Sequence, residues 1–226
     1  MPKWSKTIFG LLLLPVCGGA GWALWLVLSE LGRAGKSTAW VTMAAGAGCW
    51  LAIYLLLPKP MWIYVFGHEL THVLWTWAMG GRVKKFRASP DGGQVVVTKS
   101  NFLVALAPYF FPFYAVLVLV AFAGGRAIWG WQGYEPGFHL LLGAAYGFHL
   151  TLTWHILKSQ QSDITDQGYL FSAVVIFLGN VIVLLVAIPV LTGATPVDQA
   201  FSWWAGCTLE LLRRAATLVP GLASSR

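Results

Sequence analysis

The chain has 226 residues, of which 58% are hydrophobic and only 10% are charged. Soluble domains usually carry about a quarter charged residues, so this composition, with a mean hydropathy of +0.69, argues against a soluble protein and indicates a membrane protein. The net charge of +7 does not indicate nucleic-acid binding, because the Lys and Arg residues lie in short loops between apolar segments, as membrane topology requires.

Apolar segments of about 20 residues, the length of a membrane-crossing helix, recur along the chain. The first resembles a signal peptide, but it is long enough to cross the bilayer, so we expect a retained helix. The expected crossing helices cover residues 7–29, 39–57, 61–79, 102–123, 138–157 and 168–191. A last helix, 197–218, mixes Trp and Leu with charged residues and is expected to lie in the interface or to make a short seventh crossing.

Residues 82–99 form the only long polar segment, and its pattern differs from that of the helices. Ser-Pro-Asp-Gly-Gly at 89–93 stands between segments rich in Val and Phe, which predicts a β-hairpin. An open hairpin cannot lie in lipid, because its backbone groups would be left unsatisfied. We therefore predict an all-α polytopic membrane protein, a single domain over residues 1–226 with about six transmembrane helices, a C-terminal amphipathic helix and this short hairpin.

Charge distribution gives an expected orientation. Placing the hairpin on the cytoplasmic side puts more Lys and Arg in the cytoplasmic loops than on the opposite side of the membrane, although Lys3 and Lys6 oppose this arrangement. The polar connection that holds Asp163 and Asp166 then lies on the same side as the C-terminal end of the third helix. Residues from the two places are expected to meet just below the cytoplasmic surface.

The third helix carries the run His68-Glu69-Leu70-Thr71-His72. Two histidines four residues apart project from one helix face, a spacing that lets both imidazoles bind one Zn²⁺. Glu69 lies beside them, where it can take a proton from a water at the open metal position and pass it to a leaving amine. The alternative is a buried Glu between two satisfied histidines, but ionisable residues in an apolar helix usually mark function.

A catalytic zinc needs a third protein ligand. Asp163 and Asp166 are the favoured candidates, since both precede an apolar helix; both could instead cap that helix. The remaining candidates are histidines of the fifth apolar segment and its flank, His139, His149 and His155. Asn180, deep in the sixth segment, either joins helices by hydrogen bonds or holds a substrate backbone.

These motifs resemble the site-2 protease family of intramembrane zinc metallopeptidases over about residues 62–188. The matching runs are Phe66-Gly67 with the histidine motif, Gly80-Gly81-Arg82-Val83, Gly92 to Val97, and Ala107-Pro108. The resemblance implies that His68 and His72 bind zinc, that Glu69 is the base and that an Asp from a later helix completes the site. It also implies that the hairpin, through Val95, Val96 and Val97, presents the substrate as an added strand.

Two features depart from the family pattern: the Asp candidates lie in Ser-Asp-Ile-Thr-Asp-Gln-Gly at 162–168 rather than Leu-Asp-Gly, and the chain has no PDZ-like insert.

We therefore expect a zinc metalloendopeptidase with one Zn²⁺, a catalytic core over about residues 61–191, and a membrane protein or peptide as substrate. The compact chain suits a multi-pass protein of the bacterial cell membrane. A prenyl-protein-processing type of protease is disfavoured, because Glu135 and Glu210 are the only downstream glutamates and neither lies in a suitable motif. A non-proteolytic zinc-binding scaffold is a further alternative, and a small transporter is disfavoured because no two-half symmetry is visible.

Overall fold

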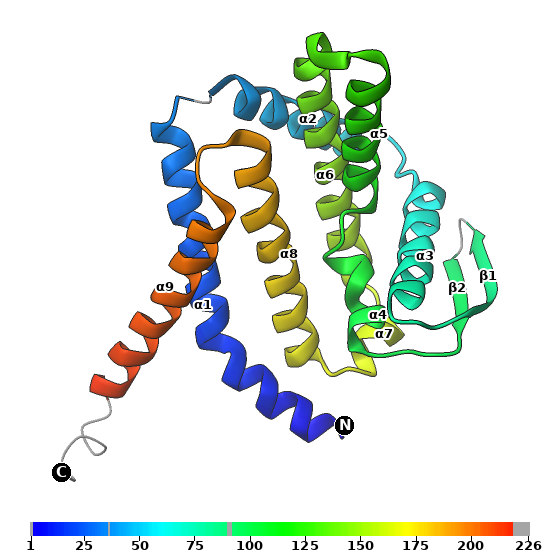
Figure 1. Cartoon of the computed structure of the whole chain (residues 1–226). Helices are drawn as coiled ribbons and strands as arrows, with labels where there is room; N and C mark the ends of the chain where they lie inside the picture. Colours follow the sequence, from blue (N-terminus) through cyan, green and yellow to red (C-terminus); the bar gives the residue numbers. More distant parts are fainter. Residues whose placement is uncertain (1, 36, 90–91, 219–226) are drawn as a thin grey trace. The chain divides into compact units, whose positions relative to one another are not determined.

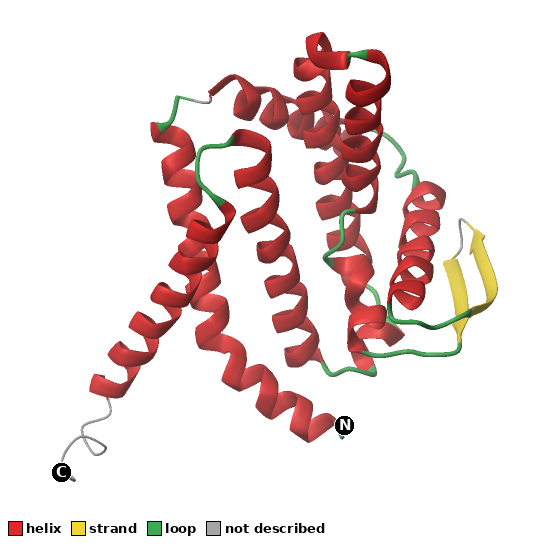
Figure 2. Cartoon of the chain, in the orientation of Figure 1, coloured by secondary structure: helices red, strands yellow, loops and turns green. Residues whose placement is uncertain are grey.

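The computed structural model describes residues 2–35, 37–89 and 92–218 (Figure 1). Helices dominate the described part of the chain, and the only strands within it form one hairpin (Figure 2). The chain divides into two compact units, one made of Met1–Lys36 with Asp166–Arg226 and the other of Ser37–Thr165. The candidate site lies entirely in the second unit.

The first unit contains α1 (Lys3–Arg33), α8 (Tyr169–Thr192) and α9 (Val197–Leu218). Helix α1 packs against both α8 and α9, and the buried core between them includes Ala23, Val27 and Leu185. Helix α8 ends at Gly193, a glycine in the left-handed conformation whose N–H donates to the carbonyl of Pro189 in the last turn. The expected helix 197–218 is confirmed.

The second unit begins with two long helices and ends with the residues that precede α8. Its elements are α2 (Ser37–Leu56), α3 (Met61–Ala78), β1 (Val83–Ser89), β2 (Gly92–Val97), α4 (Phe102–Leu106), η1 (Ala107–Tyr109), α5 (Phe113–Trp129), η2 (Trp131–Tyr134), α6 (Glu135–Leu157) and α7 (Ser162–Thr165). Helices α2 and α6 approach closely because Gly46 and Gly143 have no side chain. A Cβ added at either glycine would lie 1.9 Å from a carbonyl oxygen of the facing helix.

The expected hairpin is confirmed. Strands β1 and β2 are antiparallel, paired from Val83 with Val97 to Ser89 with Gly92, with an irregularity after Val83. The sheet packs on α3, where the ring of Phe86 meets that of Phe66 edge-on at 5.9 Å. The two residues at the tip of the expected turn, 90 and 91, lie outside the described residues.

Four helices are long and apolar enough to cross a membrane, and a fifth crossing is added if one bent pair counts as a single span. The four are Lys3–Arg33, Thr38–Leu56, Trp131–Leu157 and Tyr169–Thr192, and the bent pair is Phe102–Tyr109 with Phe113–Trp129. Helix α3, expected as the third crossing, is not among them, because its two histidines and its glutamate lower its hydropathy. A mostly helical protein with several possible crossings is thus confirmed, and the expected number of about six is not.

The fourth apolar segment is broken rather than continuous. Pro108 and Pro112 end α4 and delay α5, since a proline offers no backbone N–H and clashes with the preceding turn. The two parts are bent by 78°. This bend matters for the site, because it places the short η1 turn beside α3.

Candidate metal centre

Helix α3 supplies the two histidines of the site. It begins directly after Pro60, its N-cap residue, and is followed by Gly80, whose φ of 69° favours glycine. The side chains of His68 and His72 are 9% and 12% exposed, and their ring centres lie 5.0 Å apart. The spacing of four residues therefore puts both imidazoles on one largely buried face, as expected.

Asp163 joins them from the one-turn helix α7. Its Oδ2 lies 3.5 Å from Nε2 of His68 and 3.5 Å from Nε2 of His72. Burial disfavours the charged carboxylate, but the two imidazoles beside it outweigh this effect and hold the pKa of Asp163 well below its ordinary value. The carboxylate is therefore ionised near neutral pH, which is the form that binds a metal.

The three groups fit a zinc ion. Zinc ligands lie about 2.0–2.2 Å from the ion, so two ligands of a tetrahedral site are about 3.3–3.6 Å apart. Both observed distances from Asp163 Oδ2 agree with this range, and one ligand atom from each residue lies within 4.8 Å of the others. Among the described residues, this is the group of His, Cys, Asp and Glu side chains with metal-binding spacing.

The orientation of His72 is set by the residues that follow the hairpin. Its Nδ1 lies 2.9 Å from the carbonyl oxygen of Val104, which can only accept a hydrogen bond, so Nδ1 donates and Nε2 keeps its lone pair. Val104 is itself held, because its N–H donates to the side chain of Asn101, the N-cap of α4, at 2.9 Å. Such contacts with the non-ligating nitrogen fix the ring of a metal-binding histidine.

Glu69 lies against the hairpin. It is 8% exposed, and a Cβ added at Gly93 would lie 2.3 Å from its Cγ and 2.4 Å from its Oε1. The bare backbone of Gly93 therefore lets β2 approach the glutamate directly. This contact positions the carboxyl group that the sequence indicates as the base.

The histidines, Glu69 and Asp163 share one cavity of about 560 Å³. One side of it is formed by β2, and the other by the polar connection between α6 and α7. Its remaining lining residues include Gly92, Gly93, Gln94, Val95, Val97, Ser100, Ile156, Ser159, Gln161 and Ser162. Of the three valines expected to contact substrate, Val95 and Val97 line this cavity, whereas Val96 does not and is 37% exposed.

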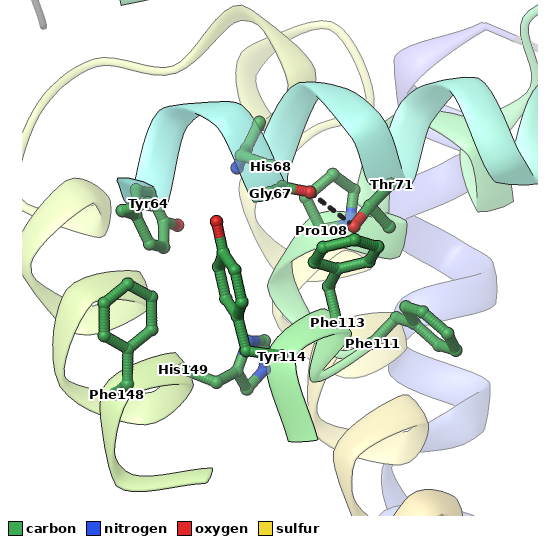
Figure 3. Close-up of a pocket in the computed structure, with 10 residues that line it drawn as sticks. All are labelled: Tyr64, Gly67, His68, Thr71, Pro108, Phe111, Phe113, Tyr114, Phe148 and His149. Carbon is green, nitrogen blue, oxygen red and sulfur yellow. Dashed lines mark hydrogen bonds between the residues drawn. The ribbon is translucent and has the colours of Figure 1, made fainter. Parts of the chain in front are cut away.

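A second, much smaller cavity of about 20 Å³ also borders His68 (Figure 3). Tyr114 points its hydroxyl toward α3, where it donates to the carbonyl of Ile63, and its ring lies against the bare backbone of Gly67. His149 also lines this cavity and is 5% exposed. It is therefore a buried neighbour of the site and is not in the group with metal-binding spacing.

The other candidate residues lie elsewhere. Asp166 is exposed, belongs to the other unit, and is not in the group with His68 and His72; its carbonyl accepts from Lys6 at 3.4 Å. Asn180 also lies in the other unit, where its Nδ2 donates to the carbonyl of Ile176 at 2.9 Å. Its role in substrate binding stays a prediction. The remaining histidines, His139 and His155, lie on α6 and are likewise outside the group.

Sequence reasoning missed three contributors: Tyr109, whose hydroxyl donates to Asp163 Oδ2 at 3.2 Å, the Asn101 cap, and Gly93. For Asn101 and Tyr109, the sequence held a pattern that could have predicted the role. An Asn directly before an apolar segment is a common N-cap, and two prolines four residues apart predict a break in the helix at the residues between them. The contact between Gly93 and Glu69 had none, because it depends on how the hairpin packs.

Comparison of the chain with protein-family models, with curated proteins and with solved structures finds no match.

Proposed function

We propose that this chain is an intramembrane zinc metallopeptidase of the site-2 protease type, which hydrolyses peptide bonds of membrane-associated substrates. One observation carries the proposal: His68, His72 and Asp163 have the mutual spacing of zinc ligands, and Glu69 lines the same cavity. Two imidazoles and one carboxylate leave the fourth position of a tetrahedral ion open, which is the arrangement of a catalytic rather than a structural zinc site.

Different residues of the site would bind the metal and transfer the proton during peptide hydrolysis. His68, His72 and Asp163 would hold the ion at the wall of the cavity that Glu69 also lines. Zinc bound there supplies Lewis acidity, which lowers the pKa of water to about 7 and polarises a peptide carbonyl. Glu69 accepts a proton on its carboxylate from the attacking water and delivers it to the leaving amine. Gly93 supports this step, because the contact of β2 with Glu69 limits where the carboxylate can move.

An extended peptide is the substrate form that this cavity favours. Strand β2 pairs with β1 and with no other strand among the described residues, so one of its edges is available for an added strand. Val95 and Val97 on β2 line the same cavity as Ser159 and Gln161. A substrate segment must leave its helical form to pair here, since only an extended backbone offers its N–H and C=O groups sideways.

Several helices that are long and apolar enough to cross a membrane support a bilayer environment for the protein. We place the protein in a bilayer, in a bacterial cell membrane, with the hairpin and the site toward the cytoplasmic face. The lipid bilayer and a membrane protein or peptide are then its partners.

Zinc content and cleavage of Glu69→Gln test the proposal. The full-length protein is purified in mild detergent, and a panel of fluorescently tagged single-span membrane helices serves as substrate. We expect Glu69→Gln to keep its zinc and lose cleavage, because the amide cannot accept the proton. The matched control is Glu135→Gln, whose half-exposed side chain lies 3.9 Å from Arg126; it should cleave like the wild type. Equal cleavage by the wild type and Glu69→Gln would contradict the proposal, as would a wild-type protein without zinc.

A further inference from the structure

The hydroxyl of Tyr109 contacts the oxygen of Asp163 that faces both histidines. It donates to Asp163 Oδ2 at 3.2 Å, and that same oxygen lies 3.5 Å from Nε2 of His68 and of His72. We propose that Tyr109 is a positioning residue that holds Asp163 as a ligand through one oxygen and so keeps the fourth metal position open. This inference rests on the proposed function, because it requires zinc at the site.

The break in the fourth apolar segment explains why a tyrosine reaches this place. Tyr109 ends the η1 turn, and Pro108 and Pro112 on either side prevent a continuous helix there. The resulting bend of 78° turns α5 away and leaves Tyr109 beside α3. In a straight helix, the chain would continue past the site instead of ending a turn next to it.

Packing holds the tyrosine ring in one orientation. Tyr109 is 0% exposed, and its ring meets that of His68 edge-on, with centres 5.2 Å apart and planes at 89°. A side chain enclosed in this way has little freedom to move its hydroxyl. Asp163, in contrast, is 27% exposed at the edge of the cavity and lies on a helix of a single turn. The rigid partner is therefore Tyr109, and the carboxylate is the group that is oriented.

Carboxylate chemistry shows what this orientation achieves. Each carboxylate oxygen has two acceptor positions, so Oδ2 can accept from Tyr109 with one and bind the ion with the other. A carboxylate that rotates freely can also present both oxygens to the metal. The second oxygen would then occupy the position that a catalytic zinc needs for water. By fixing the rotation of Asp163, Tyr109 limits it to one metal bond.

The Tyr109→Phe variant tests this role, because it removes only the hydroxyl and keeps the buried ring. The matched control is Tyr114→Phe, whose hydroxyl lies near the same helix but donates to the carbonyl of Ile63. Zinc dissociation constants are measured on the full-length protein in detergent by competition with a chelator. We expect Tyr109→Phe to bind zinc roughly 10–100-fold more weakly than the wild type, as loss of a partner of a metal ligand typically does, and Tyr114→Phe to remain within about twofold.

A second measurement distinguishes a change in the orientation of the Asp163 carboxylate from a general loosening of the metal site. In the Co²⁺-substituted protein, four-coordinate sites absorb visible light more strongly than five-coordinate ones. Tyr109→Phe should therefore show a weaker visible band at full metal loading, while Tyr114→Phe keeps the wild-type spectrum. An unchanged affinity and spectrum in Tyr109→Phe would overturn the inference, as would equal losses in both variants. These results leave the zinc site of the wild type standing, whereas a wild-type protein that binds no zinc contradicts the proposed function itself.

Discussion

Replacing Gly93 by Ala should displace the base without touching the metal ligands. The added Cβ would lie 2.3 Å from Cγ, 2.4 Å from Oε1 and 2.6 Å from Cδ of Glu69. Ordinary contacts of a Cβ begin near 3.4 Å, so the glutamate side chain must move by about 1 Å. A misplacement of about 1 Å at a reacting group can lower a rate about 100-fold, or about 2.7 kcal/mol of transition-state free energy.

The assay compares kcat for cleavage of the tagged membrane helices by the wild type and by Gly93→Ala, with zinc content measured on the same samples. We expect kcat to fall about 100-fold while zinc content is unchanged. The three atoms nearest to the added Cβ all belong to Glu69, and none belongs to the three metal-binding residues. Gly137→Ala on α6 is the control, since a Cβ there meets no atom within 4 Å among the described residues. If Gly93→Ala cleaved within about twofold of the wild type, the argument that β2 positions Glu69 would be wrong.

Two further predictions concern the support of the site. Asn101→Ala removes the side chain that accepts from the N–H of Val104, and we expect a loss of about 1 kcal/mol in stability. We also expect weaker zinc binding, because the carbonyl of Val104 orients His72. Unchanged zinc affinity would refute the idea that Asn101 supports His72 through Val104. Gly143→Ala brings a Cβ within 1.9 Å of the Met43 carbonyl oxygen, so α2 and α6 must separate. We expect the free energy of unfolding to fall by roughly 1–3 kcal/mol, which a lower Tm would report. The same Gly137→Ala control should keep its Tm.

Local patterns predicted much of the site and the elements that carry it. The spacing of His68 and His72 required only that α3 be helical, and the Ser-Pro-Asp-Gly-Gly run was enough to predict the hairpin. The choice between Asp163 and Asp166 could not be made from the sequence, because both precede the same apolar segment. In the structure α7 ends at Thr165, so Asp163 lies on that turn beside the histidines and Asp166 does not.

Long-range packing explains what sequence patterns left out. Tyr109 reaches Asp163 only because of the 78° bend, and a proline predicts a break without its angle or direction. The crossing expected for α3 is not confirmed, because this helix is not among those apolar enough to cross a membrane. Apolar residues dominate its sequence, but the groups that give it chemistry also reduce its hydropathy.

The most direct test of the account is the zinc content of purified wild-type protein, Asp163→Asn and Asp166→Asn, measured after dialysis against a weak chelator. The account predicts roughly one zinc per chain in the wild type and in Asp166→Asn, and little or none in Asp163→Asn, because two histidines alone do not complete a catalytic site. Zinc retained at the wild-type level by Asp163→Asn, or lost from Asp166→Asn, would contradict the assignment of the three ligands.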